Sequence, residues 1–247
     1  MLNIVVPMAG AGNRFAQAGY RLPKPLIDVQ GSPMIRRVID NIRPSRPHRF
    51  IFVCQRAHDS AYGLTERLSL WAPGCHVVLL DGTTEGAACT VLAAAALIDT
   101  STPLLIANSD QIVDISIDDY LAGTDATPCD GTIMTMPATD PKWSYAAIDA
   151  DGRVTRVAEK DPISSHATVG IYHFADGANF AAATRRMIAA QDRTLGEFYL
   201  APVYNHLIEA GARIRIHGIT ASQMHGIGTP EDLAAFLAAA PVQDCVA

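Results

Sequence analysis

Short apolar runs alternate with stretches of helical spacing through the first half of the chain, and this alternation constrains the fold most strongly. Four runs rich in Val, Ile, Leu or Phe are typical of buried strands: Leu2–Val6, Arg49–Cys54, His76–Leu80 and Pro103–Ala107. Between them, helices are predicted over Met34–Ile42, Ser60–Leu70 and Ala87–Ile98. Units of this kind build a parallel sheet with helices on both faces. The first half therefore predicts an α/β fold of the Rossmann-like, doubly wound type.

The second half of the chain has a more mixed pattern. Apolar runs predict further strands at Gly131–Met136, Ser144–Ile148, Val154–Glu159, Thr168–Phe174 and Arg213–Ile219. Asp149–Gly152 is typical of a hairpin turn. Helices are expected over Ala178–Ala190, part of Phe198–Ala210, and Pro230–Ala239. Because no linker-like stretch separates the halves, we expect one domain over residues 1–247, with a mixed, mostly parallel sheet.

Composition narrows the classes of protein. Hydrophobic residues make up 49% of the 247, and the net charge of −6 argues against a nucleic-acid partner, which needs clustered cations. The five cysteines form no CxxC pair, so we expect free thiols in a reducing compartment. No apolar stretch is long enough to span a bilayer, and the first residues do not resemble a signal peptide. We therefore expect a cytoplasmic protein without a membrane partner, and the oligomeric state stays open, a homo-oligomer included.

A glycine-rich turn follows the first predicted strand directly. Its backbone N–H groups are expected to approach a phosphate closely at Ala9, Gly10, Ala11 and Gly12. Two common phosphate motifs are excluded, because the dinucleotide fingerprint needs a glycine where Phe15 stands and the P-loop sequence Gly-Lys-Ser/Thr is absent.

Two cations follow this turn. Arg14 lies just beyond it, and Lys24 is held between Pro23 and Pro25, which restrict the local backbone. An arginine that binds two phosphate oxygens and a lysine that acts as a point charge together suit a triphosphate. The alternative is that both are ordinary surface cations.

These segments carry a resemblance to a known family. Met8–Phe15 followed by Pro23–Leu26 resembles the signature of sugar-phosphate nucleotidylyltransferases, such as glucose-1-phosphate thymidylyltransferases. The chain is most similar to the short members associated with capsule and lipopolysaccharide precursors, which lack the carboxy-terminal β-helix. The resemblance implies that Arg14 and Lys24 bind the triphosphate of an NTP. It also implies a nucleotide-binding half over about residues 1–125 and an acceptor-binding half over about 126–240.

A buried strand ends in polar residues at Asn108 and Asp110. Ligands of open parallel sheets bind beyond the carboxyl ends of the strands, and a carboxylate there suits Mg²⁺. The resemblance implies that Asp110 is the metal ligand and Asn108 part of the nucleotide site. The family often has a second metal-binding Asp where this chain has Gly226. Glycine has no ligand atom, so a water molecule, a phosphate oxygen or His225 is expected to fill the gap.

Acceptor residues follow from the same resemblance. Glu159 and Lys160 match the family's Glu-Lys-Pro stretch. The resemblance implies that Lys160 binds the phosphate of the acceptor. The strand around Gly170 lines the acceptor pocket in the family, and Glu197 falls where members often place an acceptor-contacting Glu. A helix N-terminal carboxylate explains Glu197 almost as well. Tyr145 is a further candidate for shaping the pocket, although aromatic residues in strands are usually core.

The donor base is predicted from a count. Family members that use dTTP or UTP have a Gln five positions before a base-contacting glycine, and counting back from Gly86 places Asp81 there. An ionised carboxylate only accepts hydrogen bonds, so it opposes the C4 carbonyl of uracil or thymine and suits the amino group of cytosine. We therefore expect CTP as donor and GTP second. Glu85 is an alternative to Asp81, and readout by backbone alone is another.

The resulting prediction is a nucleotidyltransferase that joins an NMP to a small phosphorylated metabolite, such as a sugar phosphate. Three alternatives stay open: a thymidylyl- or uridylyltransferase for a sugar 1-phosphate, a glycosyltransferase, and a non-catalytic nucleotide-sensing subunit. A glycosyltransferase usually carries Asp-x-Asp, but this strand end reads Asn108-Ser109-Asp110. No general base is needed, because a phosphate acceptor is mostly dianionic near pH 7, its second pKa being about 6.

Overall fold

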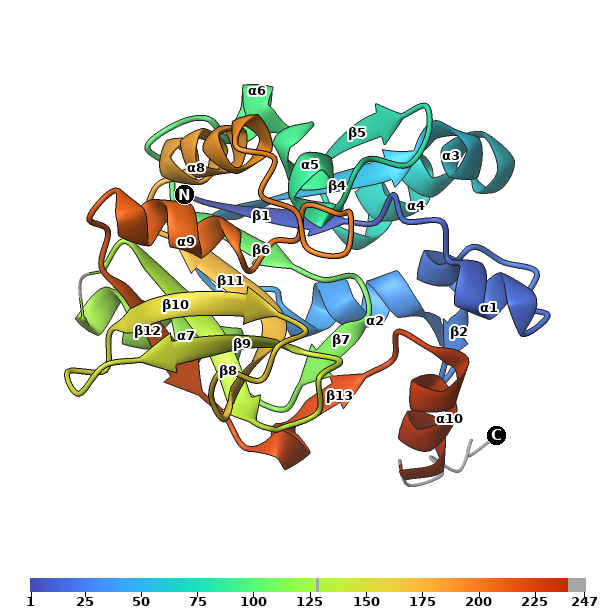
Figure 1. The fold of residues 1–247 in the computed structure, drawn as a ribbon. Helices are drawn as coiled ribbons and strands as arrows, with labels where there is room; N and C mark the ends of the chain where they lie inside the picture. Colours follow the sequence, from blue (N-terminus) through green and yellow to red (C-terminus); the bar gives the residue numbers. More distant parts are fainter. Residues whose placement is uncertain (128, 240–247) are drawn as a thin grey trace.

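A computed structural model describes residues 1–127 and 129–239, so the last part of the predicted domain lies outside the described residues. Within them, a nine-stranded sheet forms the centre of the molecule (Figure 1). Its strands are β1 (Leu2–Pro7), β4 (His48–Gln55), β5 (His76–Leu80), β6 (Leu104–Ala107), β8 (Gly131–Pro137), β9 (Ser144–Ile148), β10 (Val154–Glu159), β11 (His166–Phe174) and β12 (Ile214–Gly218).

The two halves of the chain contribute differently to this sheet. The order is β10-β9-β11-β6-β1-β4-β5, with β8 paired to both β11 and β12. β1 runs parallel to β4 and β6, and β4 runs parallel to β5. β11 then joins antiparallel to β6, and β9 and β10 form an antiparallel hairpin. The predicted α/β class with a mixed, mostly parallel sheet is confirmed.

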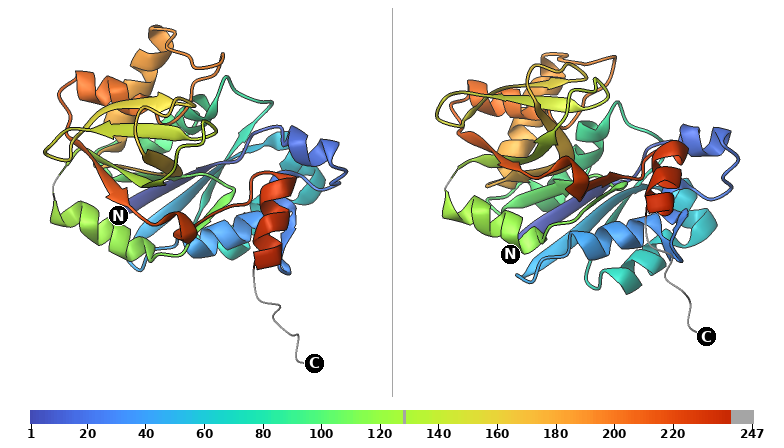
Figure 2. Two further views of the ribbon diagram at one scale, coloured as in Figure 1. Left: turned by 60° about the horizontal axis from the view of Figure 1, so that its bottom comes forward. Right: turned by 90° about the horizontal axis from the view of Figure 1, so that it is seen from below.

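Helices cover both faces of the sheet, as the two views of Figure 2 show together with Figure 1. Three helices build the core on one face: α2 (Met34–Asn41), α4 (Leu64–Trp71) and α7 (Ile117–Ala126). The opposite core contains α5 (Ala87–Leu92), α6 (Ala95–Ile98), α8 (Gly177–Ala189) and α9 (Val203–Glu209). In β1, Ile4 and Val6 pack into the first core and Val5 into the second. Full burial of such a side chain stabilises a fold by roughly 1.5–3 kcal/mol.

A third, smaller core joins two ends of the chain. It contains Phe15 from α1 (Asn13–Gln17), Met34, Ile227 and Leu233 from α10 (Pro230–Ala239). The short hairpin of β2 (Asp28–Val29) and β3 (Ser32–Pro33) belongs to the same region, as does the 3₁₀ turn η1 (Lys24–Leu26). β13 (Met224–Gly226) pairs with β7 (Gln111–Val113) and ties this region to the end of β6. The loop after β1 and the segment after β13 therefore pack on the same small core.

Some predicted elements differ in extent from the observed ones. The predicted helix over Ser60–Leu70 is two helices, α3 (Arg56–Tyr62) and α4, separated by Gly63. The predicted helix over Ala87–Ile98 is likewise divided into α5 and α6. The pattern did not indicate α1, α7 or the 3₁₀ turn η2 (Ala221–Gln223). Within the described part of the chain, each helix is too short or too polar to cross a membrane.

Candidate functional site

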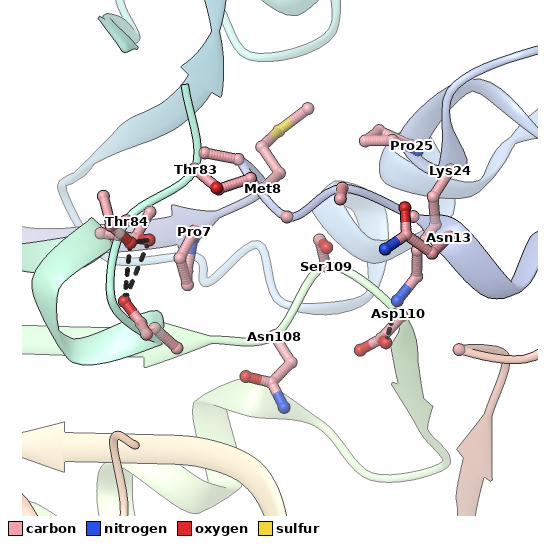
Figure 3. A pocket seen from close by; sticks show the side chains of 18 of the residues that line it. Pro7, Met8, Asn13, Lys24, Pro25, Thr83, Thr84, Asn108, Ser109 and Asp110 are labelled. Atoms are coloured by element: carbon pink, nitrogen blue, oxygen red, sulfur yellow. Dashed lines mark hydrogen bonds and ion pairs between the residues drawn. The ribbon is translucent and has the colours of Figure 1, made fainter. Parts of the chain in front are cut away.

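A cavity of about 600 Å³ opens at the carboxyl ends of β1 and β6 (Figure 3). The segment Pro7–Phe15 forms one wall, the start of α5 another, and the end of β6 a third. Ten of the predicted site residues line it: Ala9, Gly10, Ala11, Gly12, Arg14, Lys24, Gly86, Asn108, Asp110 and Glu197. The cavity therefore collects groups from segments that are far apart in the sequence.

The glycine-rich turn is braced from the neighbouring strand. Gln55, at the end of β4, donates from Nε2 to the carbonyl oxygen of Ala9 at 2.8 Å. At the other end of the turn, Phe15 is 1% exposed and anchors α1 in the third core. With the Ala9 carbonyl turned toward Gln55, backbone N–H groups of the turn are left for an anion.

Lys24 and Asp110 meet inside the cavity. Lys24 Nζ donates to Asp110 Oδ2, and the side chains are 20% and 21% exposed. Gly228 packs against this pair, because a Cβ at residue 228 would lie 2.4 Å from Asp110 Oδ2. The N–H of Ile227 also donates to the Asp110 carbonyl oxygen at 2.9 Å. Both backbone and side chain of Asp110 are thus fixed by the segment after β13.

Asp110 offers a metal ion one carboxylate among the described residues. The described residues contain no group of three or more His, Cys, Asp or Glu side chains arranged to hold a metal. Gly226 lies opposite Gln111 in the β13–β7 pair and offers no ligand atom. His225 does not fill the gap, because its Nε2 is 2.7 Å from Asp114 Oδ2. One carboxylate fits Mg²⁺, which often takes one or two protein oxygens and completes its shell with phosphates and waters.

A pair of amide side chains lies where the two halves of the sheet meet. The N–H of Asn108 donates to the carbonyl oxygen of Gly170 at 2.9 Å. A Cβ on Gly170 would lie 1.8 Å from Gln111 Oε1 and 2.4 Å from Asn108 Nδ2, and φ is +77° there. Glycine at 170 therefore makes room for both amides. Gln111 Oε1 is buried and accepts no hydrogen bond from the described residues. Figure 3 shows the Asn108 side chain pointing away from the glycine-rich turn.

Glu159 and Lys160 belong to the half of the chain that was predicted to bind the acceptor, and neither is among the residues that line the cavity. Ser144 Oγ donates to Glu159 Oε2, and burial raises the pKa of the Glu159 carboxyl. Lys160 Nζ donates to the hydroxyl oxygen of Tyr199 at 2.9 Å and lies 5.0 Å from the centre of its ring. That hydrogen bond raises the pKa of Lys160. The Glu159 carboxylate and the Lys160 ammonium group therefore each already have a hydrogen-bond partner within the protein.

Glu197 connects the two halves of the site. It follows a tight turn in which Thr194 and Glu197 exchange backbone hydrogen bonds of 3.0 Å. The next residue, Phe198, donates its N–H to the Glu85 carbonyl oxygen at 2.8 Å, which brings the turn to the start of α5. The Glu197 charge also contributes to the raised pKa values of Glu159 and Lys160. Glu197 therefore lines the cavity and lies within electrostatic reach of the acceptor half.

Comparison with known proteins identifies the family. Residues 4–198 match the family model described as Nucleotidyl transferase. The chain belongs to the nucleotidyl transferase family. This confirms the predicted resemblance and the predicted class of enzyme.

The relatives of this nucleotidyl transferase include longer bifunctional proteins and a solved structure of similar length. The bifunctional protein GlmU of Paraburkholderia phymatum is 30% identical over 223 residues, 86% of this chain and 46% of that protein. GlmU of Burkholderia thailandensis is 28% identical over 219 residues, again 86% and 46%. The chain spans about half the length of these curated relatives. A nucleoside-diphosphate-sugar pyrophosphorylase structure from Vibrio cholerae RC9 is 27% identical, with a TM-score of 0.81, covering 95% of this chain and 99% of that one.

A second solved structure shows the fold alone. It is a Bacillus anthracis protein, described as a glucose-1-phosphate thymidylyltransferase in complex with a sucrose, and is 17% identical. The TM-score is 0.76, and the match covers 96% of this chain and 94% of that one.

Three predicted residues lie elsewhere than expected in this nucleotidyl transferase. Asp81 Oδ1 accepts from Arg56 Nε at 2.6 Å, and its side chain is 84% exposed. The Glu85 carboxylate accepts from Arg193 and is 65% exposed. Neither carboxylate is among the residues that line the cavity. Tyr145 is fully buried in the first core, beside Ala167 of β11, and its hydroxyl donates to the Asp140 carbonyl oxygen at 2.7 Å.

Several cavity residues were not predicted from the sequence. The wall at the start of α5 carries Thr83, Thr84 and Thr90, and the hydroxyls of Thr84 and Thr90 are 2.6 Å apart (Figure 3). Gly228 also lines the cavity and was not predicted. Gln111, which begins β7 outside the cavity lining, was also not predicted, and its place directly after Asp110 was the signal that could have identified it.

Proposed function

We propose that this protein is a sugar-phosphate nucleotidyltransferase that transfers an NMP from an NTP to a sugar phosphate and releases pyrophosphate. One observation carries the proposal: Arg14, Lys24 and Asp110 line the same cavity as the glycine-rich turn. Two cations, backbone N–H groups and one carboxylate are the set that a triphosphate and its metal ion require.

The reaction needs positioning and charge neutralisation more than proton transfer. An oxygen of the acceptor's phosphate forms a bond to the α-phosphorus of the NTP, and the bond from that phosphorus to the β-bridging oxygen breaks. Arg14 and Lys24 stabilise the negative charge of the departing pyrophosphate. Asp110 would hold Mg²⁺, which when bound neutralises and aligns phosphate oxygens. Since the attacking phosphate is already largely dianionic near pH 7, this step requires no general base.

On the acceptor side, Lys160 is proposed to bind the acceptor's phosphate after exchanging its hydrogen bond with Tyr199. Glu159 and Gln111 supply hydrogen-bond acceptors for sugar hydroxyls, and Gly170 leaves room for the Gln111 side chain. Among the described residues, none donates a hydrogen bond to the buried Gln111 Oε1, which supports a hydroxyl-bearing acceptor because a buried carbonyl oxygen is stabilised when it gains a donor.

The identity of the donor base is proposed from Asp81, two residues before Thr83 of the cavity lining. CTP remains the first donor to test, since the Asp81 carboxylate accepts hydrogen bonds, and GTP is the second. UTP and dTTP form the rival pair, favoured by a specific observation: Arg56 is bonded to Asp81 and brings guanidinium donors that suit a carbonyl at C4. A further part of the proposal is a cytoplasmic role in making precursors of cell-surface polysaccharides such as capsule.

Pyrophosphate release tests the proposal directly. The purified protein is mixed with Mg²⁺, each of CTP, GTP, UTP, dTTP and ATP, and a panel of sugar 1-phosphates, polyol phosphates and phosphocholine. The proposal expects release that requires both an NTP and a sugar phosphate. Release without an acceptor, or with phosphocholine alone among the acceptors, would contradict it.

A further inference from the structure

The carboxylate of Asp110 is already engaged by a cation that belongs to the protein. Lys24 Nζ contacts Asp110 Oδ2, and each side chain is about one-fifth exposed. Water and salt screen a pair at this depth less than a pair on the surface. A divalent ion that binds Asp110 must therefore compete with the ammonium group of Lys24.

The surroundings of the pair limit how the carboxylate can respond. A Cβ on Gly228 would lie 2.4 Å from Asp110 Oδ2 and 3.5 Å from Lys24 Nζ, so the backbone at 228 packs against both groups. The Ile227 N–H holds the Asp110 carbonyl oxygen from the same side. Asp110 is thus fixed at the end of β6, whereas Lys24 has a long flexible side chain that can move.

Lys24 has a second anionic partner within reach once a nucleotide is present. It lines the same cavity as the glycine-rich turn and Arg14, where the proposed function puts the triphosphate. We infer that Lys24 occupies the metal position on Asp110 in the free protein and leaves it when a triphosphate binds. The divalent ion then binds tightly together with the nucleotide and weakly without it. This inference rests on the proposed function for its triphosphate, and on the Lys24–Asp110 contact for the competition.

Linkage makes the inference quantitative. If triphosphate binding raises the affinity for the divalent ion by some factor, the ion raises the affinity for the triphosphate by the same factor. Coupling between sites typically amounts to roughly 5- to 150-fold. Removing Lys24 should lower this coupling, because Asp110 is then open to the ion before any nucleotide arrives, and the part that comes from direct contact between the ion and phosphate oxygens remains.

The test measures Mn²⁺ binding through water-proton relaxation, which requires no turnover. Without nucleotide, Lys24→Met should bind Mn²⁺ on the order of tenfold more tightly than the wild type. Lys24→Gln serves as a second variant if Lys24→Met does not fold, and thermal melting checks both. Arg14→Met is the matched control, because it removes one positive charge from the same cavity while leaving the Lys24–Asp110 pair in place. The double variant with Asp110→Asn and Lys24→Met should lose the increase in Mn²⁺ affinity that Lys24→Met shows over the wild type.

Two outcomes would overturn the inference. One is a Lys24→Met protein that binds Mn²⁺ no more tightly than Arg14→Met. The other is a wild type whose Mn²⁺ affinity is the same with and without a CTP or UTP analogue that has a non-cleavable α,β-methylene bridge. Failure of the proposed function is separate, since it would appear as absent pyrophosphate release while the nucleotide-free Mn²⁺ series still tests the competition.

Discussion

The two sides of the site differ in how their charged groups are held. On the donor side, Arg14, Lys24 and Asp110 line one cavity, and the pair formed by the last two is inside it. On the acceptor side, Glu159 is bonded to Ser144 and Lys160 to Tyr199, outside the cavity lining. The donor side therefore has its groups gathered before substrate arrives. If Glu159 and Lys160 bind the acceptor as proposed, they exchange internal hydrogen bonds for bonds to substrate, so their contribution to binding is a difference between two similar interactions.

The largest expected effect is on the donor side, at Asp110. We expect Asp110→Ala to lower kcat by on the order of 10³-fold or more, since both the charge balance and the metal contact at the phosphates are lost. Steady-state pyrophosphate release at saturating Mg²⁺ measures it, and EDTA should abolish wild-type activity reversibly. Asp114→Asn is a matched control, because Asp114 is bonded to His225 outside the cavity. Substantial Mg²⁺-dependent turnover in Asp110→Ala would remove Asp110 as the principal ligand.

Lys24 comes next in expected size. Lys24→Ala should lower kcat by roughly 10²–10³-fold, comparable to the loss of one preorganised electrostatic donor. The melting temperature should change little, because the residue lies at the cavity and not in a core. Lys142→Ala is the control, an exposed lysine beside Trp143 whose loss should leave turnover unchanged. Near-normal turnover in Lys24→Ala would contradict the role assigned to it.

The same contrast explains what the sequence could predict. The glycine-rich turn, Arg14 and Lys24 are recognisable because they lie within 16 residues of one another beside a strand. Asp110 is recognisable because it ends an apolar run. The alternating apolar pattern likewise predicted the strands of the sheet, since buried strands alternate between the two cores.

What the sequence could not predict depends on distant partners. Lys24 and Asp110 are 86 residues apart, and nothing local indicates that they touch. Glu85 is paired with Arg193, 108 residues away, which removes it from the cavity lining. The Lys24–Asp110 pair depends on the sheet order, in which β1 is next to β6, and a count along the chain does not contain that information.

On the acceptor side, Lys160 should have a smaller effect. We expect Lys160→Met to raise the KM for the sugar phosphate by roughly 10- to 100-fold, the range for losing a hydrogen bond to a charged group. The KM for the NTP should stay close to that of the wild type. Tyr199→Phe should act in the opposite sense, lowering the acceptor KM slightly, because it frees Lys160 from its internal partner. An equal rise of both KM values in Lys160→Met would show that the two sides are not separate.

The buried carboxyl of Glu159 should make the stability of the protein depend on pH. Burial raises the pKa of its carboxyl above the ordinary value of 4.5, so the ionised form is disfavoured in the folded state. The stability linked to this group is therefore present below pH 4.5 and is lost as pH rises through the raised pKa. Glu159→Gln should melt at a higher temperature than the wild type at pH 7, and the difference should vanish near pH 4. At pH 7 the same variant should raise the acceptor KM by about tenfold, because a charged hydrogen-bond acceptor is lost. A melting temperature at pH 7 equal to or below that of the wild type would argue against the buried charge.

The smallest effect is expected at Asp81, which is proposed to read the donor base. Its carboxylate is 84% exposed and bonded to Arg56, so solvent and the guanidinium both weaken its influence on a base at the cavity. We expect kcat/KM to be highest for CTP, lower for GTP, and lowest for UTP and dTTP. Asp81→Asn should reduce the ratio of kcat/KM for CTP to that for UTP by about threefold, since the amide offers both a donor and an acceptor. Arg56→Gln is the matched variant: it should shift the ratio further toward CTP, because the guanidinium donors that suit a C4 carbonyl are gone. Glu85→Gln should leave the ratio unchanged. If the wild type prefers UTP or dTTP and Arg56→Gln reduces that preference, then Arg56 reads the base and the CTP proposal fails.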